Sequence, residues 1–365
     1  MTTLNRSCFV LALIAIAPAC ATIEDGPTKD ELAAGATGGK ADGFDWCAAR
    51  DYYGDGECDR FCARHDEDCP LLGPEPTRAK TRYPIIIHHG FAGGNAGIFA
   101  YKGVAAALAA DGNTVVQTTV PPFDSIAVRS AVLEQIIDDT LRTTGAAKVN
   151  IIAHSMGGLD ARYLIATLGY GDRVASLTTI STPHRGTRGG DLGLRLIPHG
   201  DAAVNALAGI LGEQISGTPL SVNVRAALTD LSVAEAPARN SATPDDSRVY
   251  YQSWAGVSSV LGLASEGTAV EGICEGKLEI NRDTFDRMRL AFVPLDPVIG
   301  SFGADAHDGL VTVASAKWGN FKGCIPADHS DEVGQVTTAT PNPKTDWDPA
   351  RFYRQVADDL AARGF

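Results

Sequence analysis

The chain has 365 residues, of which 44% are hydrophobic and 21% are charged, which suffices for one large α/β domain with small additions. Its formal net charge of -13 argues against binding to nucleic-acid backbones, which requires clustered Lys and Arg. The same acidity discourages electrostatic docking on anionic membranes. We therefore expect no nucleic-acid partner, and we expect any lipid contact to be apolar.

The N-terminus resembles an export signal. Arg6 precedes "CFVLALIAIAPACA", an apolar run that ends in small residues and is too short to span a bilayer comfortably. We expect residues 1–20 to be a signal peptide and the mature protein to be secreted or a cell-surface lipoprotein. Cys20 is a candidate for a lipid anchor, although Ala17 stands where such sites favour Leu. The alternative is a buried N-terminal helix.

Composition divides the rest of the chain into segments. Residues 21–45 are rich in Gly, Ala and Thr, which predicts a flexible linker, and residues 71–80 form a second linker with two prolines. Between them, residues 46–70 form a Cys-rich module that is too small and polar to bury a core. The acidic "DYYGDGECD" in this module is interpreted as a solvated loop, with weak calcium binding as the alternative. The globular domain is expected over residues 81–365.

In an exported protein, the cysteines are expected to form disulfides. The module should contain two disulfides, with the pairing left open, among Cys47, Cys58, Cys62 and Cys69. Zinc is the alternative ligand, but C-x-x-C pairs are missing and an oxidising compartment disfavours it. Cys274 and Cys324 remain as a third pair.

From residue 81 onward, apolar β-type runs alternate with helical patterns. Strands are expected within residues 83–90, 113–120, 148–153, 173–182 and 248–256, and helices within 97–112, 125–145 and 156–169. Continuous apolar strands separated by helices predict a mostly parallel sheet with helices on both faces. Functional residues of such sheets gather at the carboxyl ends of the strands.

One such strand end carries a serine. In "KVNIIAHSMGGLDARYL" a strand runs directly into a helix at Ser155. A sharp strand-to-helix bend brings the two elements close together, so it requires small residues two positions either side of the nucleophile. Ala153 and Gly157 meet this requirement. The alternative is an ordinary turn serine.

A nucleophilic serine needs donors for the oxyanion that it creates. The backbone amide of Met156 follows the serine directly. The glycines of "HHGFAGG" allow the loop after residues 83–90 to fold over the site, so the backbone amide of Phe91 is the second candidate donor.

The serine also needs a base, and the base needs an acid. In α/β-hydrolases the chain order is nucleophile, acid, histidine. His329 is the histidine that follows the late acidic cluster, and Asp308 in "AHDGLV" is the best candidate acid. Gly309 would permit a turn beyond a strand end. Asp305 and Asp296 are rival acids.

Several blocks together resemble one known family. "TRYPIIIHHGFAG", "GAAKVNIIAHSMGGLDARY", "HDGLVTVASAKWG" and "HSDEVGQ" are similar, in the same order, to blocks of the secreted bacterial triacylglycerol lipases of the Burkholderia and Pseudomonas type. The resemblance covers about residues 81–336. It implies an α/β-hydrolase fold, a lipase acting through an acyl-enzyme on Ser155 with Asp308 and His329, and oxyanion donors at Phe91 and Met156.

The resemblance also implies a structural calcium ion. Its ligands would be the carboxylates of Asp296 and Asp331 and main-chain carbonyls that include that of Gln335. The alternative is that both acids are solvated. The interval between Asp296 and Asp308 is shorter than in the Burkholderia members. Many relatives use a dedicated folding chaperone, and we expect a monomer acting on a lipid or ester substrate at an interface.

A lid is expected within about residues 187–235. In "DAAVNALAGILGEQI", apolar side chains recur on one helical face, namely Val204, Leu207, Leu211 and Ile215. This stripe could instead belong to the core.

Two other functions remain open at this point. A non-lipolytic carboxylesterase or polyester depolymerase would share every catalytic residue. A surface-tethered binding protein with an inert hydrolase domain belongs to a different class.

Overall fold

The computed structural model describes most of the chain, and its centre is one parallel sheet. The described residues are 27–33, 45–57, 59, 62, 66, 68, 75–94, 99–197, 222–262, 273–274, 286–301, 303–336, 340–342 and 345–365. The sheet has six strands in the order β2-β1-β3-β4-β5-β8. The strands are β1 Ile85–His88, β2 Val115–Gln117, β3 Val149–His154, β4 Val174–Ile180, β5 Tyr250–Gly256 and β8 Asn320–Ile325. Every neighbouring pair is parallel, as predicted.

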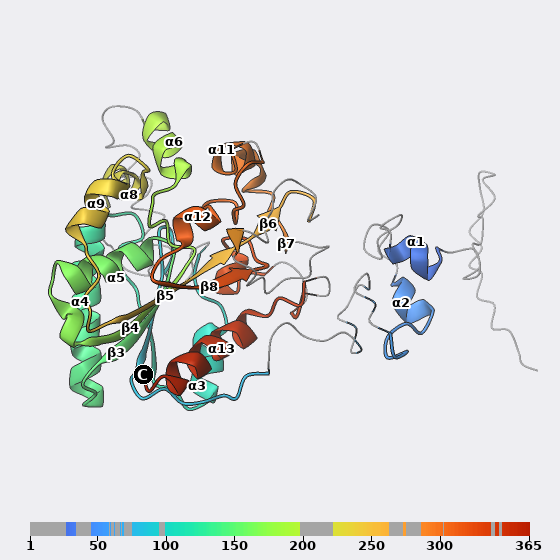
Figure 1. Ribbon diagram of the computed structural model, residues 1–365, viewed down its shortest axis with the longest axis horizontal. Coiled ribbons are helices and arrows are strands. Elements are labelled where there is room, and N and C mark those ends of the chain that lie inside the picture. Colours follow the sequence, from blue (N-terminus) through green and yellow to red (C-terminus); the bar gives the residue numbers. More distant parts are fainter. Residues whose placement is uncertain are drawn as a thin grey trace, which may run out of the picture.

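Helices cover both faces of this sheet. Side chains alternate between the two faces along each strand, so the apolar residues of one strand pack on helices of both layers. Ile85 and Ile87 pack on α3 and α13, whereas Ile86 packs on α4 and α5. These helices are α3 Val104–Ala110, α4 Ile126–Thr144, α5 Met156–Ala166 and α13 Pro349–Ala362. Figure 1 shows the sheet between the two pairs. This arrangement confirms the predicted α/β-hydrolase fold.

Local signals set the limits of the long helix α4. Ser125 caps its first turn by accepting a hydrogen bond from Val128 N, and Gly145 ends it at φ 69°. Both limits agree with the sequence prediction. By contrast, α3 begins at Val104, later than predicted, because Gly103 at φ 77° interrupts the helical pattern directly before it.

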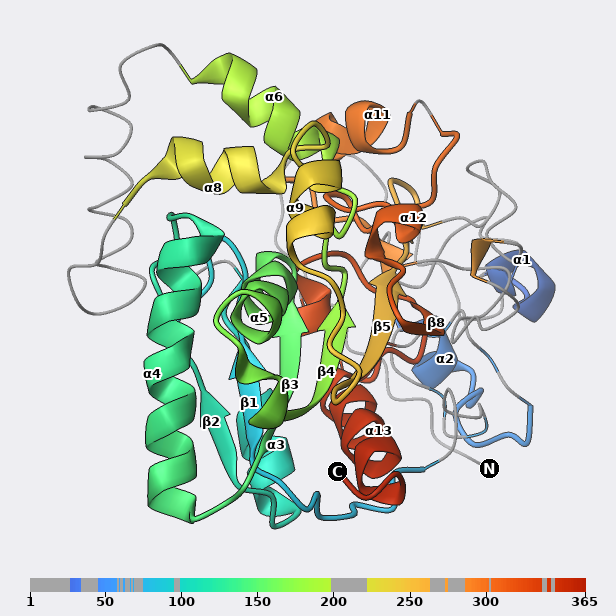
Figure 2. The ribbon, with the colours of Figure 1, turned by 60° about the vertical axis from the view of Figure 1, so that its left-hand side comes forward.

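Shorter helices lie beyond the carboxyl ends of the strands. Figure 2 shows α6, α8 and α11 on the side to which β3, β4 and β5 point. The helices of this region are α6 Arg188–Leu196, α8 Val224–Leu231, α9 Ala236–Ala242, α11 Asp296–Ile299 and α12 Val313–Ala316. The helices α6 and α8 belong to the predicted lid, whereas the stripe of Val204, Leu207, Leu211 and Ile215 lies outside the described residues.

The remaining elements are short. They are the two-stranded sheet of β6 Ser258–Ser259 and β7 Asp286–Arg287 and the 3₁₀ turns η2 Tyr170–Asp172, η3 Val293–Leu295 and η4 Asp331–Val333. The segment that carries His329 follows strand β8 directly. Pairing of β8 with β5 fixes the start of this segment at the edge of the sheet.

A short helix lies among the described residues of the N-terminal part. The predicted linker contains α1 Lys29–Ala33, and α2 Trp46–Ala49 opens the Cys-rich module. The ammonium group of Lys29 lies 2.9 Å from Asp55 Oδ2 and 2.8 Å from Asp59 Oδ2, so α1 is tied to the module. The segment 1–20, predicted to be a signal peptide, lies outside the described residues. Among the helices that are described, none combines the length and apolar character needed to cross a membrane.

Two disulfides are formed among the described cysteines. Cys47 pairs with Cys62 in the module, and Cys274 pairs with Cys324, as predicted. The other two module cysteines, Cys58 and Cys69, lie outside the described residues.

Candidate active site

Ser155 occupies a sharp bend between β3 and α5. Its backbone has φ 55° and ψ -131°, a conformation that non-glycine residues rarely adopt, and such strain is common at functional sites. A Cβ atom on Gly157 would lie 2.8 Å from His89 O, and Ala153 is fully buried. A side chain at position 157 would therefore push α5 away from the end of β1, and a larger one at position 153 would disturb the buried cluster to which Ala153 belongs.

The structure brings Ser155, His329 and Asp308 into one hydrogen-bonded row. His329 Nε2 lies 2.9 Å from Ser155 Oγ, and His329 Nδ1 lies 2.7 Å from Asp308 Oδ2. His329 N also donates to Asp308 O at 2.9 Å. All three side chains are buried, and the ring of Phe99 stands edge-on against the imidazole of His329. This geometry allows His329 to accept the serine proton while Asp308 holds the ring.

Asp308 is built to remain ionised. Burial opposes its charge, but His329 and the amides of Val311 and Leu310 outweigh burial, so the pKa of Asp308 is lowered. Both amides donate to Asp308 Oδ1. Contrary to expectation, Asp308 does not follow a strand of the sheet. It lies in a turn between α11 and α12, where Gly309 at φ 97° permits the reversal.

The rival acids face other partners. Asp305 Oδ2 lies 2.9 Å from Arg188 and 2.7 Å from the hydroxyl of Ser301. Asp296 Oδ1 lies 3.3 Å from His307 Nε2. Neither carboxylate is among those that contact His329.

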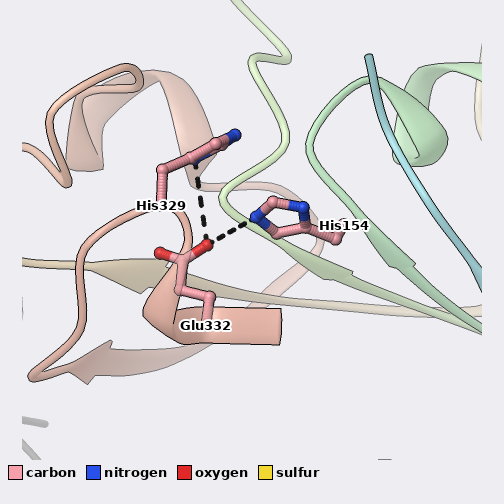
Figure 3. A group of neighbouring side chains, drawn as sticks. All are labelled: His154, His329 and Glu332. Atoms are coloured by element: carbon pink, nitrogen blue, oxygen red, sulfur yellow. Dashed lines mark hydrogen bonds and ion pairs between the residues drawn. The ribbon is translucent and has the colours of Figure 1, made fainter. Parts of the chain in front are cut away.

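Glu332 is a second carboxyl group beside His329 that the sequence analysis missed. Figure 3 shows it next to both His329 and His154. Its Oε2 lies 2.9 Å from His154 Nε2 and 3.9 Å from His329 Nδ1, and its Oε1 accepts a hydrogen bond from Ser181 at 2.5 Å. Burial, followed by the charge of Asp308, raises the pKa of Glu332 well above its usual value. The environment thus favours an ionised Asp308 and a neutral Glu332. No local sequence signal distinguishes Glu332 from the other acids of "HSDEVGQ".

The loop that carries Phe91 lies directly against the bend at Ser155. A Cβ atom on Gly90 would be 2.6 Å from Ser155 Cβ and 2.9 Å from Met156 N. The loop backbone therefore approaches the start of α5 as closely as a glycine allows. This contact places the segment containing the predicted amide donor Phe91 beside the other predicted donor, Met156.

Apolar side chains of α8 cover these two residues. Ala227 and Leu231 share a buried cluster with Met156, and Phe91 packs against the same cluster. A second cluster joins Val224 of α8 to aromatic side chains near the site, namely Phe99, Phe123 and Phe292. The helix α8 thus packs over the candidate site.

Three carboxylates gather next to the His329 loop. Oxygen atoms of Asp286, Asp328 and Asp331 all lie within 4.8 Å of one another. The guanidinium group of Arg289 donates to both Asp331 Oδ1 and Gln335 O, so these two predicted calcium ligands converge. Carboxylate and carbonyl oxygens are ligands that calcium prefers, and therefore this donor set fits the ion.

Burial and mutual repulsion make the acids of this cluster resist ionisation, although Arg289 contacts Asp331. Burial, followed by repulsion from Asp328, raises the pKa of Asp331 to about 7. Burial and the charges of Asp331 and Asp328 also raise the pKa of Asp286. The structure does not bring the predicted ligand Asp296 to this cluster: Asp296 begins α11 and lies beside His307. Asp286, which does belong to the cluster, lies ten residues before Asp296 in the chain. The short interval between Asp296 and Asp308 was the sequence feature that could have pointed to an earlier acid.

Comparison with known proteins identifies relatives of this chain. Residues 83–200 match the family model described as alpha/beta hydrolase fold. The chain is 30% identical over 304 residues to a triacylglycerol lipase of Burkholderia plantarii, covering 73% of this chain and 83% of that one. It is also 30% identical over 297 residues to a triacylglycerol lipase of Pseudarthrobacter phenanthrenivorans, covering 71% and 91%.

Two solved structures share the fold. Staphylococcus hyicus lipase superposes with a TM-score of 0.55 at 19% identity, covering 80% of this chain and 98% of that one. A metagenomic carboxyl esterase superposes with a TM-score of 0.54 at 14% identity, covering 87% and 89%. From the sequence relatives, the chain belongs to the triacylglycerol lipases, which are carboxylic ester hydrolases of the α/β-hydrolase class.

Proposed function

We propose that the protein hydrolyses triacylglycerols through an acyl-enzyme on Ser155. The observation that carries this proposal is the hydrogen-bonded row from Ser155 Oγ through His329 to Asp308, with atom distances of 2.9 and 2.7 Å. The names of the relatives described above support the substrate class.

In the first half-reaction, Ser155 Oγ attacks the ester carbonyl carbon while His329 Nε2 takes the hydroxyl proton. The amides of Phe91 and Met156 stabilise the resulting oxyanion. As the tetrahedral intermediate collapses, the ester bond breaks and the imidazolium of His329 protonates the departing alcohol. In the second half-reaction, water attacks the acyl-enzyme, His329 takes its proton, and the fatty acid leaves as Ser155 recovers its hydrogen.

A direct test compares Ser155→Ala with wild type on emulsified long-chain triacylglycerol and on dissolved p-nitrophenyl butyrate. Loss of any triad member is expected to lower kcat on the order of 10⁴-fold or more. Ser241→Ala, at an exposed position of α9, is the matched control and should retain wild-type rates. Hydrolysis by Ser155→Ala would contradict the mechanism. Activity restricted to the dissolved ester would identify a non-lipolytic esterase.

We also propose that a calcium ion is held by Asp286, Asp331 and the carbonyl of Gln335, with Asp328 beside them. Bound calcium would supply positive charge to these buried carboxylates and so stabilise the loop that carries His329. At a hundredfold excess over Kd, such a ligand stabilises the fold by about 2.7 kcal/mol.

Thermal unfolding after chelation tests the calcium proposal. Calcium should raise the Tm of wild type and of Asp296→Asn, the matched control, but have little effect on Asp286→Asn. An equal calcium response of Asp286→Asn and wild type would reject the proposed ligand set, and an absent response in wild type would reject the ion.

Finally, we propose that the protein is exported. The disulfides Cys47–Cys62 and Cys274–Cys324 support this, because disulfides persist in oxidising compartments. Mass spectrometry of the protein recovered outside the cytoplasm should find a mature N-terminus near Cys20 and would reveal whether this residue is lipidated. An intact Met1 in the recovered protein would contradict signal cleavage.

A further inference from the structure

A fully buried ion pair connects the helix that follows Ser155 to its neighbouring helix. Arg129 of α4 and Asp160 of α5 are both inaccessible to solvent. Arg129 Nε donates to Asp160 Oδ2 at 2.8 Å, and His88 Nε2 lies 2.9 Å from the same oxygen. A buried ion pair contributes little net stability compared with apolar residues of similar volume. Stability alone therefore does not account for this pair.

The guanidinium group directs its other donors at two backbone carbonyls. Arg129 Nη1 donates to Pro121 O at 2.6 Å, and Nη2 donates to His89 O at 2.7 Å. Within the described structure, Asp160 Oδ1 is buried and has no hydrogen-bond partner. Arg129 Nε and Nη2 both lie 2.8 Å from Asp160 Oδ2, so the pair uses one carboxylate oxygen, whereas the strongest Arg–carboxylate pairs engage both oxygens in a fork. Asp160 thus orients a cation whose remaining donors hold the backbone.

The backbone held in this way is the loop around Phe91. His89 O is fixed by Arg129 two residues before Phe91, and on its other side Ala92 N donates to Pro122 O at 2.9 Å. Pro122 follows Pro121, whose carbonyl Arg129 also binds. Arg129 therefore holds the segment directly at His89 and indirectly, through Pro121 and Pro122, at Ala92, so that both sides of the Phe91 amide are fixed.

A second tie reaches the same loop from the strand before it. His88 is the last residue of β1, and its ring spans from Asp160 Oδ2 to the hydroxyl of Thr118, which lies 2.8 Å from Nδ1. Burial is the main cause that lowers the pKa of His88, which favours a neutral ring. The ring therefore donates from Nε2 to the carboxylate. Asp160 thus contacts β1 directly and the Phe91 loop through Arg129.

Asp160 also belongs to the element that carries the other amide. It lies four residues after Met156 in α5, one helical turn away on the same side. We infer that Asp160 is a positioning residue for ester hydrolysis, which through Arg129 and His88 sets the distance between the amides of Phe91 and Met156. This inference rests on the proposed function, because only an oxyanion bound by both amides would respond to their spacing.

The test variant is Asp160→Asn, which keeps the size of the side chain and removes its charge. Its kcat on p-nitrophenyl butyrate should fall about 10- to 100-fold, because displaced oxyanion donors act in the transition state. KM should stay within about threefold, and the affinity for a trifluoromethyl ketone, which forms a tetrahedral adduct with serine, should fall in parallel with kcat. The pH at the midpoint of the acid limb of kcat/KM should not move, because the His329 and Asp308 contacts are unchanged.

The matched control is Ser130→Ala. Ser130 Oγ donates to Asp160 O at 2.9 Å, so this variant loosens the same two helices but leaves the carboxylate and Arg129 paired. Its Tm should fall while its kcat stays within about twofold of wild type. An equal loss of kcat in Ser130→Ala and Asp160→Asn would show a general packing effect and overturn the inference.

Arg129→Lys provides a second variant in case Asp160→Asn does not fold. Lysine keeps the charge but cannot reproduce the planar fork that reaches Asp160 and two carbonyls, so the same loss of kcat is expected. A folded Asp160→Asn or Arg129→Lys that keeps kcat within about threefold of wild type overturns the inference. Ser155→Ala separates the two claims: if it is inactive, such a result rejects only the role of Asp160, whereas an active Ser155→Ala rejects the proposed mechanism itself.

Discussion

Gly90→Ala should lower turnover strongly in a protein that still folds. The added Cβ would lie 2.6 Å from Ser155 Cβ, 2.9 Å from His154 O and 2.9 Å from Met156 N. These atoms belong to the backbone of the bend or to its first side-chain carbon, so none can rotate away. The Phe91 loop and the start of α5 must therefore separate.

The size of this separation follows from the contact distances. Ordinary contacts of a Cβ atom begin near 3.4 Å, and the closest contact is 2.6 Å, so the two segments must part by about 0.8 Å. A misplacement of roughly 1 Å at reacting groups costs about 10²-fold in rate. We therefore expect kcat to fall about 100-fold, with a loss of about 1–3 kcal/mol in the free energy of unfolding from overpacking.

The assay is hydrolysis of dissolved p-nitrophenyl butyrate, with Tm measured on the same samples. Gly189→Ala is the control, because its Cβ would meet Thr187 Oγ1 at 3.4 Å and Ile299 Cδ1 at 3.5 Å, both ordinary distances. Because alanine is a better helix former than glycine, this control substitution within α6 should leave kcat unchanged and raise stability by up to about 1 kcal/mol. A folded Gly90→Ala that retains more than about a tenth of the wild-type kcat would refute the close-approach argument.

The buried acids and the second disulfide can be tested in the same way. The pKa of Asp331 is about 7 in the folded protein and near 3.8 in the unfolded chain, so stability without calcium should fall as pH rises from about 4 to 7. Calcium should therefore raise Tm more at about pH 8 than at about pH 5.5. Equal calcium effects at both pH values in thermal unfolding would contradict this. Asp308→Asn should lower kcat by on the order of 10⁴-fold and Asp305→Asn by less than about twofold, and the reverse ratio in ester hydrolysis would reassign the acid. Replacing both Cys274 and Cys324 with Ser should lower the free energy of unfolding by about 4 kcal/mol, since the disulfide closes a loop with a sequence separation of 50. An unchanged midpoint of urea unfolding would show that the disulfide does not stabilise the fold.

Features that depend on neighbouring residues could be predicted from the sequence. The apolar run before Ser155 and the small residues at Ala153 and Gly157 predict a strand, a sharp bend and a helix, because the bend imposes its steric demand within a few positions. The limits of α4 follow in the same way from Ser125 and Gly145. Chain order and family resemblance then led to Asp308 and His329, which the structure places beside Ser155.

Long-range partners were decided by the tertiary structure. Asp286 and Asp296 are both acids upstream of Asp308, and only folding shows that the first joins Asp331 whereas the second faces His307. The tie from Asp160 to the Phe91 loop likewise depends on side chains 31 and 72 residues away. A carboxylate has the same chemistry wherever it stands in a sequence, and its role depends on the burial and the charges that folding brings around it, which no local pattern encodes.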